Sequence, residues 1–428
     1  MTDNHTALAS ALAAVVGSNN LIENRSLRIN TLVPAFVVSP GSHDEGRECL
    51  KICAAFHAAI VPAGAMTWLD GGNSLRRADV VLSLQRLKRV IDYSPPDLTA
   101  TVEAGLSLQE FNQLAKPENQ WLPLDPPGAP YATLGAIVAC ASHGALRFGF
   151  GTPRDYVIGL RLAHIDGTES KCGGRVVKNV AGYDMNKLYT GSFGTLAVIT
   201  EITFKLRPLP ERVATITATH GDFPGLAEAA KSVLASPSLQ PASVFVTRTH
   251  RADADRNDLF IRFIESDITV THQLNETITL LSDLLQKDSE IAVLPHDSSA
   301  SWDTINQADL SGGNVTVRLH LPVATLATAF AKVLPASDES YLAADFGTGI
   351  IRINFAADEA QAISLIKQMR AEAEAVGGNI FIERAAPQIK EQLGAWNEVS
   401  DLATLMRGVK RNFDPEGLLN AGRFVAGI

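Results

Sequence analysis

Three stretches of small residues are the part of this sequence best suited to chemistry. They occupy residues 62–67, 134–151 and 182–195, each beside the expected end of a strand or helix. Small residues let backbone N–H groups approach a diphosphate, because few Cβ atoms intrude. One such loop alone is usually a turn, but three in one region favour a long, anionic cofactor. Their spacing does not identify that cofactor.

Motifs for other common chemistries are missing from the sequence. It contains no phosphate-binding G-x-x-x-x-G-K-[ST] loop, and no G-x-G-x-x-G joins a strand to a helix. Neither H-E-x-x-H nor G-x-S-x-G stands in a convincing context. The cysteines are too few for a disulfide framework and form no C-x-x-C pair; they are Cys49, Cys53, Cys140 and Cys172. We therefore expect no metal centre and no iron–sulfur cluster on this chain.

Length, composition and charge exclude several classes of protein. The 428 residues suggest two or three domains, and a hydrophobic fraction of 46% excludes a disordered chain. The net charge of −9 and the absence of a long basic run argue against nucleic-acid binding. No apolar run is long enough to span a bilayer. The apolar stretch 8–16 follows Asp3 and His5 rather than basic residues, so we expect a short helix and a cytoplasmic protein.

Residues 33–210 alternate short strands with helices. Strands are expected at 33–38 and 79–84, and Ser42 with Glu45 has the spacing of a capping box that begins a helix. The clearest alternation of apolar and polar residues lies at 202–207 and predicts a strand with one buried face. Pro208 and Pro210 follow that strand. We place a domain boundary at about residue 210.

The pattern after residue 210 occurs twice. A strand, a helix, two strands and a long helix are expected over 213–287, and the same order recurs over 315–376 before a strand at 379–382. Each pass is typical of a ferredoxin-like βαββαβ unit. The sequence thus predicts an α+β protein with four parts. These are a helical extension (1–32), a first domain (33–210), a domain of two βαββαβ units (211–395) and a C-terminal return segment (396–428).

Several longer motifs carry a family resemblance. The chain has V-P-A-G-A-M-T-W at 61–68, L-P-L-D-P-P-G at 122–128, G-G-R-V-V-K-N-V-A-G-Y-D at 173–184 and D-P-E-G-L-L-N-A-G-R at 414–423. With these motifs it resembles the FAD-binding E subunits of glycolate oxidases, within the vanillyl-alcohol oxidase / p-cresol methylhydroxylase (PCMH) superfamily. The resemblance implies a two-subdomain PCMH-type FAD-binding domain, followed by a cap of duplicated βαββαβ units.

The resemblance also implies which residues hold FAD. The loop 62–67 would bind the diphosphate through its backbone, a second group would line the diphosphate and isoalloxazine region, and the segment 191–199 would pass close to the cofactor. The residues implied are Pro62, Ala63, Gly64, Ala65, Met66, Thr67, Leu134, Gly135, Ser142, Gly144, Gly151, Thr152, Gly191, Gly194, Thr195, Val198 and Ile199. For Tyr183, Asp184 and Lys187 the resemblance implies no clear role in binding FAD. Anchoring a helix explains these residues at least as well.

The sequence departs from the family pattern in two respects. Ala65 and Met66 stand at positions of the diphosphate loop that are usually glycine, so the Met66 side chain must point away from the cofactor. The loop also lacks a His or Cys for covalent attachment, and His143 has a loop role as its simpler explanation. We therefore predict noncovalent FAD. The cap lacks the H-x-G-D-G-N-x-H motif of related 2-hydroxy acid dehydrogenases, and no catalytic residue is identified.

Together these features predict an FAD-binding subunit of a glycolate oxidase (glycolate dehydrogenase) complex. It would support oxidation of glycolate, a small 2-hydroxy acid, to glyoxylate. Its expected partners are a catalytic FAD subunit and an iron–sulfur subunit, with no nucleic acid and no membrane span. Two alternatives remain open from the sequence. One is a stand-alone FAD-dependent oxidase or dehydrogenase of another hydroxylated substrate, and the other is a flavin-free assembly scaffold.

Overall fold

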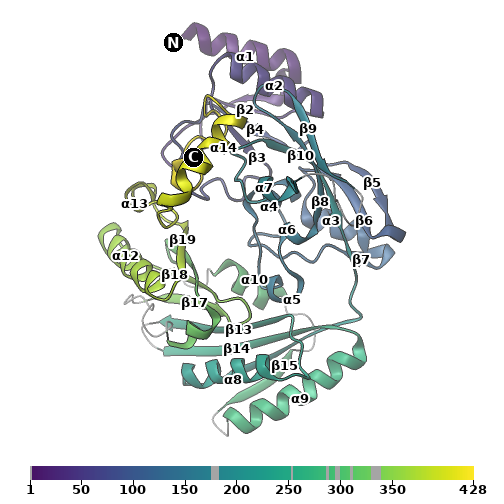
Figure 1. The fold of residues 1–428 in the computed structure, drawn as a ribbon, viewed down its shortest axis with the longest axis vertical. Helices are drawn as coiled ribbons and strands as arrows, with labels where there is room; N and C mark the ends of the chain where they lie inside the picture. Colours follow the sequence, from purple (N-terminus) through teal and green to yellow (C-terminus); the bar gives the residue numbers. More distant parts are fainter. Residues whose placement is uncertain are drawn as a thin grey trace. The chain divides into compact units, whose positions relative to one another are not determined.

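The chain folds into two compact units. The computed structural model describes residues 2–174, 183–251, 254–285, 289–294, 299–308, 312–328 and 339–428. The first unit comprises Met1–His143, Thr152–Leu209 and Glu398–Ile428, and the second comprises Gly144–Gly151 and Pro210–Asn397 (Figure 1). The C-terminal return segment is therefore part of the first unit. Most of the predicted G-G-R-V-V-K-N-V-A-G stretch lies outside the described residues.

A small, mostly parallel sheet opens the first unit. Its order is β1-β2-β4-β3, with β1 antiparallel to β2 and the other pairs parallel. Strand β4 is buried along its whole length, as expected for a parallel strand covered on both faces. The helices α1 and α2 pack together beside this sheet. The elements are α1 (Thr2–Val16), β1 (Leu21–Glu23), β2 (Phe36–Val38), α2 (His43–Ala55), β3 (Ile60–Ala63) and β4 (Val80–Ser83).

A five-stranded antiparallel sheet forms the second layer of this unit, in the order β5-β6-β10-β8-β9. Ile202 and Phe204 on β10 are fully buried, in agreement with the alternation in the sequence. Its elements are β5 (Val90–Ser94), β6 (Thr99–Glu103), β8 (Val157–Ala163), β9 (Glu169–Gly173) and β10 (Val198–Lys205). The two-residue strands β7 (Gln120–Trp121) and β11 (Arg207–Pro208) pair beside it. The remaining helices are α3 (Leu108–Ala115), α4 (Leu134–Cys140), α6 (Pro153–Tyr156), α7 (Asn186–Tyr189) and α14 (Ser400–Phe413).

Side-chain caps fix where several helices begin. Ser107 and Glu110 form a complete capping box at the start of α3. At α2, Ser42 accepts from the Glu45 N–H at 3.1 Å, but the Glu45 carboxylate accepts from the Gly41 N–H rather than from that of Ser42. The expected box at Ser42 is therefore only half formed.

The second unit is one eight-stranded antiparallel sheet made of two equivalent halves. Its order is β15-β12-β14-β13-β17-β18-β16-β19, so each half contributes four strands in mirrored order and β13 joins β17 at the centre. This arrangement confirms the predicted duplication. The strands are β12 (Arg212–Thr219), β13 (Ser243–Arg251), β14 (Ala254–Glu265), β15 (Glu290–Leu294), β16 (Val315–His320), β17 (Ser340–Asp345), β18 (Ile350–Phe355) and β19 (Asn379–Arg384).

The two faces of this sheet are covered differently. Figure 1 shows α8 (Phe223–Ala235) and α9 (Asp267–Leu285) on one side of the sheet and α10 (Ser299–Gln307) on the other. The core packs between the sheet and the helices α8, α9 and α12 (Glu359–Ala375). Short helices α5 (Arg147–Phe150) and α13 (Pro387–Leu393) complete the unit. Half of the predicted helix over 324–333 lies outside the described residues, and the described half begins with a 3-10 turn at Val323–Thr325 and continues as helix to residue 328.

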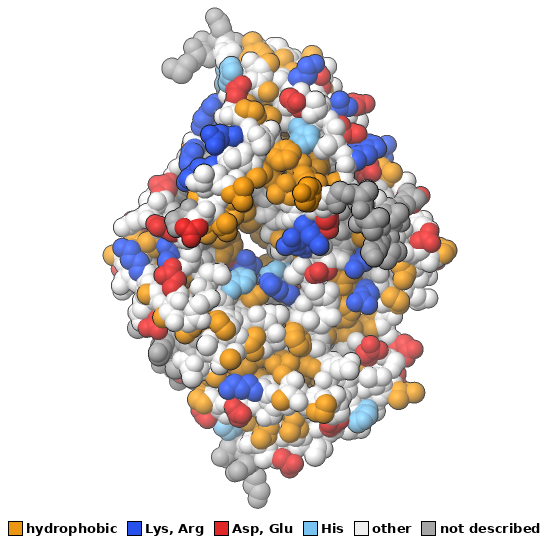
Figure 2. Space-filling model, in the orientation of Figure 1, with side chains coloured by type: hydrophobic (Ala, Val, Ile, Leu, Met, Phe, Trp, Pro, Cys, Tyr) orange, Lys and Arg blue, Asp and Glu red, His pale blue; other side chains and the backbone are white. Residues whose placement is uncertain are grey.

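On the face shown in Figure 2, acidic and basic side chains are interspersed. Among the described residues, no helix is both long enough and apolar enough to cross a membrane.

Candidate cofactor site

A groove in the first unit collects residues from four separate parts of the chain. Its walls come from the end of β3 and the loop after it, from α4, from the segment that enters β10, and from the C-terminal tail. The space between the walls, including the part open to solvent, measures about 740 Å³. The lining residues are Val61, Pro62, Ala63, Gly64, Met66, Thr67, Trp68, Leu69, Leu84, Ala104, Thr133, Gly135, Ala136, Ala139, Cys140, Phe193, Gly194, Ala197, Val198, Ile199, Asn420 and Arg423.

Close backbone packing explains the glycines of the groove. A Cβ atom at Gly64 would lie 2.0 Å from Oγ1 of Thr133, the residue that caps α4. A Cβ atom at Gly135 would lie 2.7 Å from Cβ of Ala104, at the end of β6. Side chains at either position would separate the loop, the helix and the sheet. The groove is therefore lined by backbone and small side chains because larger ones do not fit.

Met66 occupies a conformation that favours glycine. Its φ is 62°, in the left-handed region where an L side chain costs about 1–2 kcal/mol. The side chain packs against the apolar cluster that includes Val61 and Leu75. This packing directs the Met66 side chain into the protein, as the sequence required of a methionine in a cofactor loop. Ala65 has no positive φ and does not line the groove.

The C-terminal tail contributes Arg423, the charged side chain among the residues that line the groove. Arg423 is 3% exposed, and its Nη1 donates to the backbone carbonyls of Leu69 and Gly71. Its Nε and Nη2 atoms are buried and have no hydrogen-bond partner among the described residues. Burial lowers the pKa of Arg423 to about 10, so the group is positively charged at neutral pH. A buried cation with two unused donors is completed by an anionic ligand.

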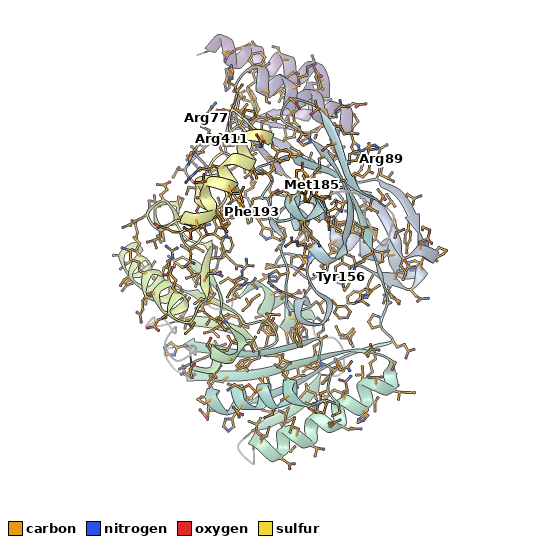
Figure 3. The ribbon with its side chains drawn as sticks, in the orientation of Figure 1. Arg77, Arg89, Tyr156, Met185, Phe193 and Arg411 are labelled. Atoms are coloured by element: carbon orange, nitrogen blue, oxygen red, sulfur yellow. The ribbon has the colours of Figure 1, made fainter. Side chains whose placement is uncertain are left out.

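Asn420 fixes the tail against the groove. Its Nδ2 donates to the Phe193 carbonyl at 2.7 Å, while its Oδ1 is buried without a partner. Phe193, labelled in Figure 3, lies on the segment between α7 and β10, and its ring is 5.8 Å from that of Phe424. Cys140 lies in the same wall, and burial raises the pKa of its thiol to about 11. A protonated thiol agrees with noncovalent binding, because the thiolate is the nucleophile.

The groove contains part of the predicted site. Nine of the positions listed from the sequence line it: Pro62, Ala63, Gly64, Met66, Thr67, Gly135, Gly194, Val198 and Ile199. Six other positions of the first unit do not: Ala65, Leu134, Ser142, Thr152, Gly191 and Thr195. Leu134 is buried in the core and Thr195 in a turn, and the Ser142 N–H donates to the Ile137 carbonyl of α4. Gly144 and Gly151 belong to the second unit.

Sequence reasoning missed Asn420 and Arg423 as groove residues. The tail motif that contains them was noticed only as part of a resemblance. Arg423 lies 354 positions from the Leu69 carbonyl to which it donates, so no local pattern could indicate the contact. The available signal was the run L-N-A-G-R itself, which places an arginine directly after a glycine.

Comparison with known proteins identifies the class of ligand. Residues 34–173 match the family model described as "FAD binding domain", and residues 322–424 match "FAD linked oxidases, C-terminal domain". The chain is an FAD-dependent oxidoreductase. Its fold is that of p-cresol methylhydroxylase, whose solved structure with bound substrate superposes with a TM-score of 0.76 at 14% identity, covering 99% of this chain and 97% of that one.

Two relatives show which glycolate oxidase subunits the chain is similar to, and over what length. The chain is 25% identical over 427 residues to glycolate oxidase subunit GlcD of Bacillus subtilis, covering 92% of this chain and 89% of that protein. It is 39% identical to glycolate oxidase subunit GlcE of Escherichia coli, but only over 122 residues, 28% of this chain and 35% of that protein. Similarity along the whole chain is thus to a D subunit, and the resemblance to E subunits holds for one segment.

The residues of the groove fit FAD. Gly64 and Gly135 leave room for close backbone contact, and Arg423 offers two buried donors to a negatively charged group. Asn420 offers a buried acceptor that suits an N–H of the cofactor. These residues of the FAD-dependent oxidoreductase would therefore hold the cofactor, with Phe193 in the wall beside it. Bound FAD supplies the redox chemistry, and the chain supplies position and charge.

Proposed function

We propose that this chain is the FAD-binding subunit of a cytoplasmic glycolate oxidase complex. In this complex glycolate would be oxidised to glyoxylate by a catalytic flavoprotein subunit, with electrons leaving through an iron–sulfur subunit. This chain would contribute a second FAD and an assembly surface. The observation that carries the proposal is a groove suited to FAD in a chain that lacks the histidine motif of the catalytic relatives.

The missing histidines support dependence on a partner. The segment 345–352 reads D-F-G-T-G-I-I-R and keeps the two glycines of H-x-G-D-G-N-x-H at their spacing. Asp345 and Arg352 stand where the motif has its histidines. Among the described residues no three His, Cys, Asp or Glu side chains gather as metal ligands. An arginine cannot replace a metal-ligating histidine, because it stays protonated.

Similarity to both glycolate oxidase subunits also supports the proposal. The segment shared with GlcE has the higher identity, 39% against 25% for GlcD, although it is the shorter. The chain is similar to a D subunit along most of its length and to an E subunit over one segment. This combination suits a protein that has the overall fold of a D subunit but acts beside a separate, catalytic D subunit. Any iron–sulfur cluster of the complex would be held by another chain, since Cys49 and Cys53 are buried here and no C-x-x-C pair occurs.

Co-purification with spectroscopy tests the proposal. The tagged chain is purified from its native cells, and flavin, iron and acid-labile sulfide are measured in the chain alone and in the co-purified material. We expect noncovalent FAD on the chain, a second flavoprotein, and an iron–sulfur protein, with glycolate-dependent dye reduction only in the assembled material. Dye reduction by the chain alone would instead support a stand-alone dehydrogenase. Absence of flavin from the chain in a competent complex would support an assembly scaffold.

A further inference from the structure

Another hollow of the first unit lies between α14, the loop before β4 and the C-terminal tail. The space that it encloses, including the part open to solvent, measures about 830 Å³. The described residues that line it include Arg76, Arg407, Lys410 and Arg411, and none of them has an acidic side chain. None of them lines the cofactor groove, although both sites lie against the same tail. A hollow lined in this way suits an anion other than FAD.

Two glycines of the tail fix the position of Arg76. A Cβ atom at Gly422 would lie 2.8 Å from Arg76 Cγ, and a Cβ atom at Gly427 would lie 2.7 Å from Arg76 Nη2. Both glycines have a positive φ, 90° and 68°, which disfavours a side chain at either position. The Arg76 N–H also donates to the Ala421 carbonyl at 2.8 Å. The Arg76 side chain therefore lies against bare backbone and loses little freedom when its guanidinium binds a ligand.

One side of α14 brings the other two arginines to the pocket. Thr404, Arg407 and Arg411 are spaced by three and four residues, so they lie on the same side of the helix. Arg411, labelled in Figure 3, is in the last turn, where a cation complements the free carbonyls of the helix. Arg407 gains no such benefit one turn earlier, and like charges four residues apart destabilise a helix by about 0.2–0.5 kcal/mol. This spacing favours a ligand that contacts both guanidiniums.

The arginines of the pocket have no counter-charge among the described side chains. Within the described residues, no carboxylate side chain forms an ion pair with Arg76, Arg407 or Arg411. The Arg407 Nη2 donates to a backbone carbonyl, that of Ala426, at the long distance of 3.4 Å. Lys410 differs from the arginines, because Asp414 neutralises it. The three guanidiniums thus keep their charge and most of their donors for a ligand.

The excess charge fits a phosphate dianion. Ile428 also lines the pocket, and its main-chain oxygen accepts from the Phe424 N–H at 2.8 Å. A carboxylate at Ile428 would offset one of the three positive charges, and two would remain. A phosphate group carries about two negative charges near neutral pH. Guanidiniums bind its oxygens through paired N–H donors, and the Thr404 hydroxyl can donate as well.

We propose that this pocket binds a phosphate dianion through Arg76, Arg407 and Arg411, with a further hydrogen bond from Thr404. The dianion is either free phosphate or the phosphate group of a small ester, because the hollow is much larger than one phosphate group. A ligand bound here links the loop of Arg76 to α14 beside the tail that carries Arg423. The site goes beyond the proposed function, since it requires neither glycolate nor a partner subunit.

A titration of the full-length, FAD-loaded protein tests this site, because FAD occupies the other groove. Inorganic phosphate, glycerol 3-phosphate and glycerol are titrated by calorimetry at constant ionic strength and about pH 8, where the phosphates are dianions. We expect one site per chain for a phosphate and no binding of glycerol. Tighter binding of glycerol 3-phosphate identifies an ester as the source, and equal or weaker binding of it identifies free phosphate. No saturable binding of either phosphate would overturn the proposal.

Paired variants assign the binding to the pocket. Arg76→Met and Arg407→Met should each weaken phosphate binding at least tenfold, because each removes charge-assisted hydrogen bonds. Arg77→Met is the matched control, since Arg77 is the next residue of the same loop but pairs with Asp79 at 2.8 Å and does not line the pocket. It should weaken binding less than threefold.

All three variants remove exposed arginines, so their circular dichroism and FAD content should match those of the parent. Equal losses of phosphate affinity in the three would show an effect of net charge alone and would overturn the site. The titration uses no partner and no turnover. Its result is therefore independent of whether the proposed glycolate oxidase complex exists.

Discussion

The two units differ in how their buried arginines find hydrogen-bond partners. The groove of the first unit is built from backbone and small residues, and its one buried guanidinium, Arg423, keeps two donors unused. The polar face of the second unit's sheet, where Arg318, Arg352 and Glu383 lie, is built from large side chains, and its arginines are mostly paired with Glu383. The first arrangement is incomplete without a large anionic ligand. The difference shows that glycine placement, more than charge, marks the cofactor-binding unit.

The largest effect is expected from the ion pair that fastens the tail of the first unit. Lys410 is buried and bonds Asp414, the Thr195 carbonyl at 2.7 Å and the Leu419 carbonyl at 2.9 Å. Lys410→Met would leave Asp414 buried without its counter-charge, at a cost of about 3–5 kcal/mol. Urea unfolding of the FAD-free protein measures this. Lys51→Met, which removes an exposed pair, should cost less than about 1 kcal/mol, and equal losses would refute the assigned role.

A smaller loss is expected where the groove depends on glycine. Gly64→Ala would place a Cβ atom 2.0 Å from Thr133 Oγ1, which costs about 1–3 kcal/mol and opens the contact between loop and helix. The free energy of unfolding and the FAD content after purification should both fall. Gly408→Ala on α14 meets no atom within 4 Å and should stabilise the protein by about 0.5–1 kcal/mol. If Gly64→Ala keeps full FAD content, the close approach has no role in binding.

Met66 tests how far the groove depends on glycine, because it is a non-glycine residue of the groove with a positive φ. Met66→Gly and Met66→Ala both remove its packing, but only glycine relieves the left-handed φ of 62°. We expect Met66→Gly to be more stable than Met66→Ala by about 1 kcal/mol. FAD affinity should follow the same order. Equal unfolding free energies for the two variants would mean that the loop relaxes to another conformation.

A further effect concerns the pH dependence of the second unit. Burial lowers the pKa of His320, on β16, to about 3 in the folded protein, against about 6.5 in an unfolded chain. Between these values the unfolded chain binds more protons, so the unfolding free energy falls as the pH is lowered through this range. His320→Gln should therefore lose less stability than the parent between pH 7 and pH 5. Asp345, whose pKa is raised to about 6, acts in the opposite direction in both proteins.

The control for this pH prediction is His272→Gln, because His272 is exposed on α9. Its unfolding free energy should follow that of the parent protein at both pH values. If the unfolding free energy of His320→Gln showed the same dependence on pH as that of the parent, His320 would not be buried near Arg318, Arg147 and Arg352.

The sequence predicted the parts of this molecule whose signals are local. The duplicated strand–helix order of the second unit follows from periodicity, and the start of α2 after Ser42 follows from a short-range hydrogen bond. Gly64 and Gly135 were found because small residues concentrate where backbones approach. Arg423 was not found, because its position depends on how the chain returns to the loop after β3. Arg318 and Glu383 were missed likewise, since 65 positions separate two side chains that only sheet pairing brings together.

One titration tests the central claim, that the groove binds FAD through the tail arginine. FAD affinity is measured by flavin fluorescence for the wild type, for Arg423→Met and for Arg411→Met, which changes an exposed arginine of α14 that does not line the groove. The account predicts at least tenfold weaker binding for Arg423→Met and less than a twofold change for Arg411→Met, with both variants folded by circular dichroism. Equal affinity of folded Arg423→Met and wild type would contradict it.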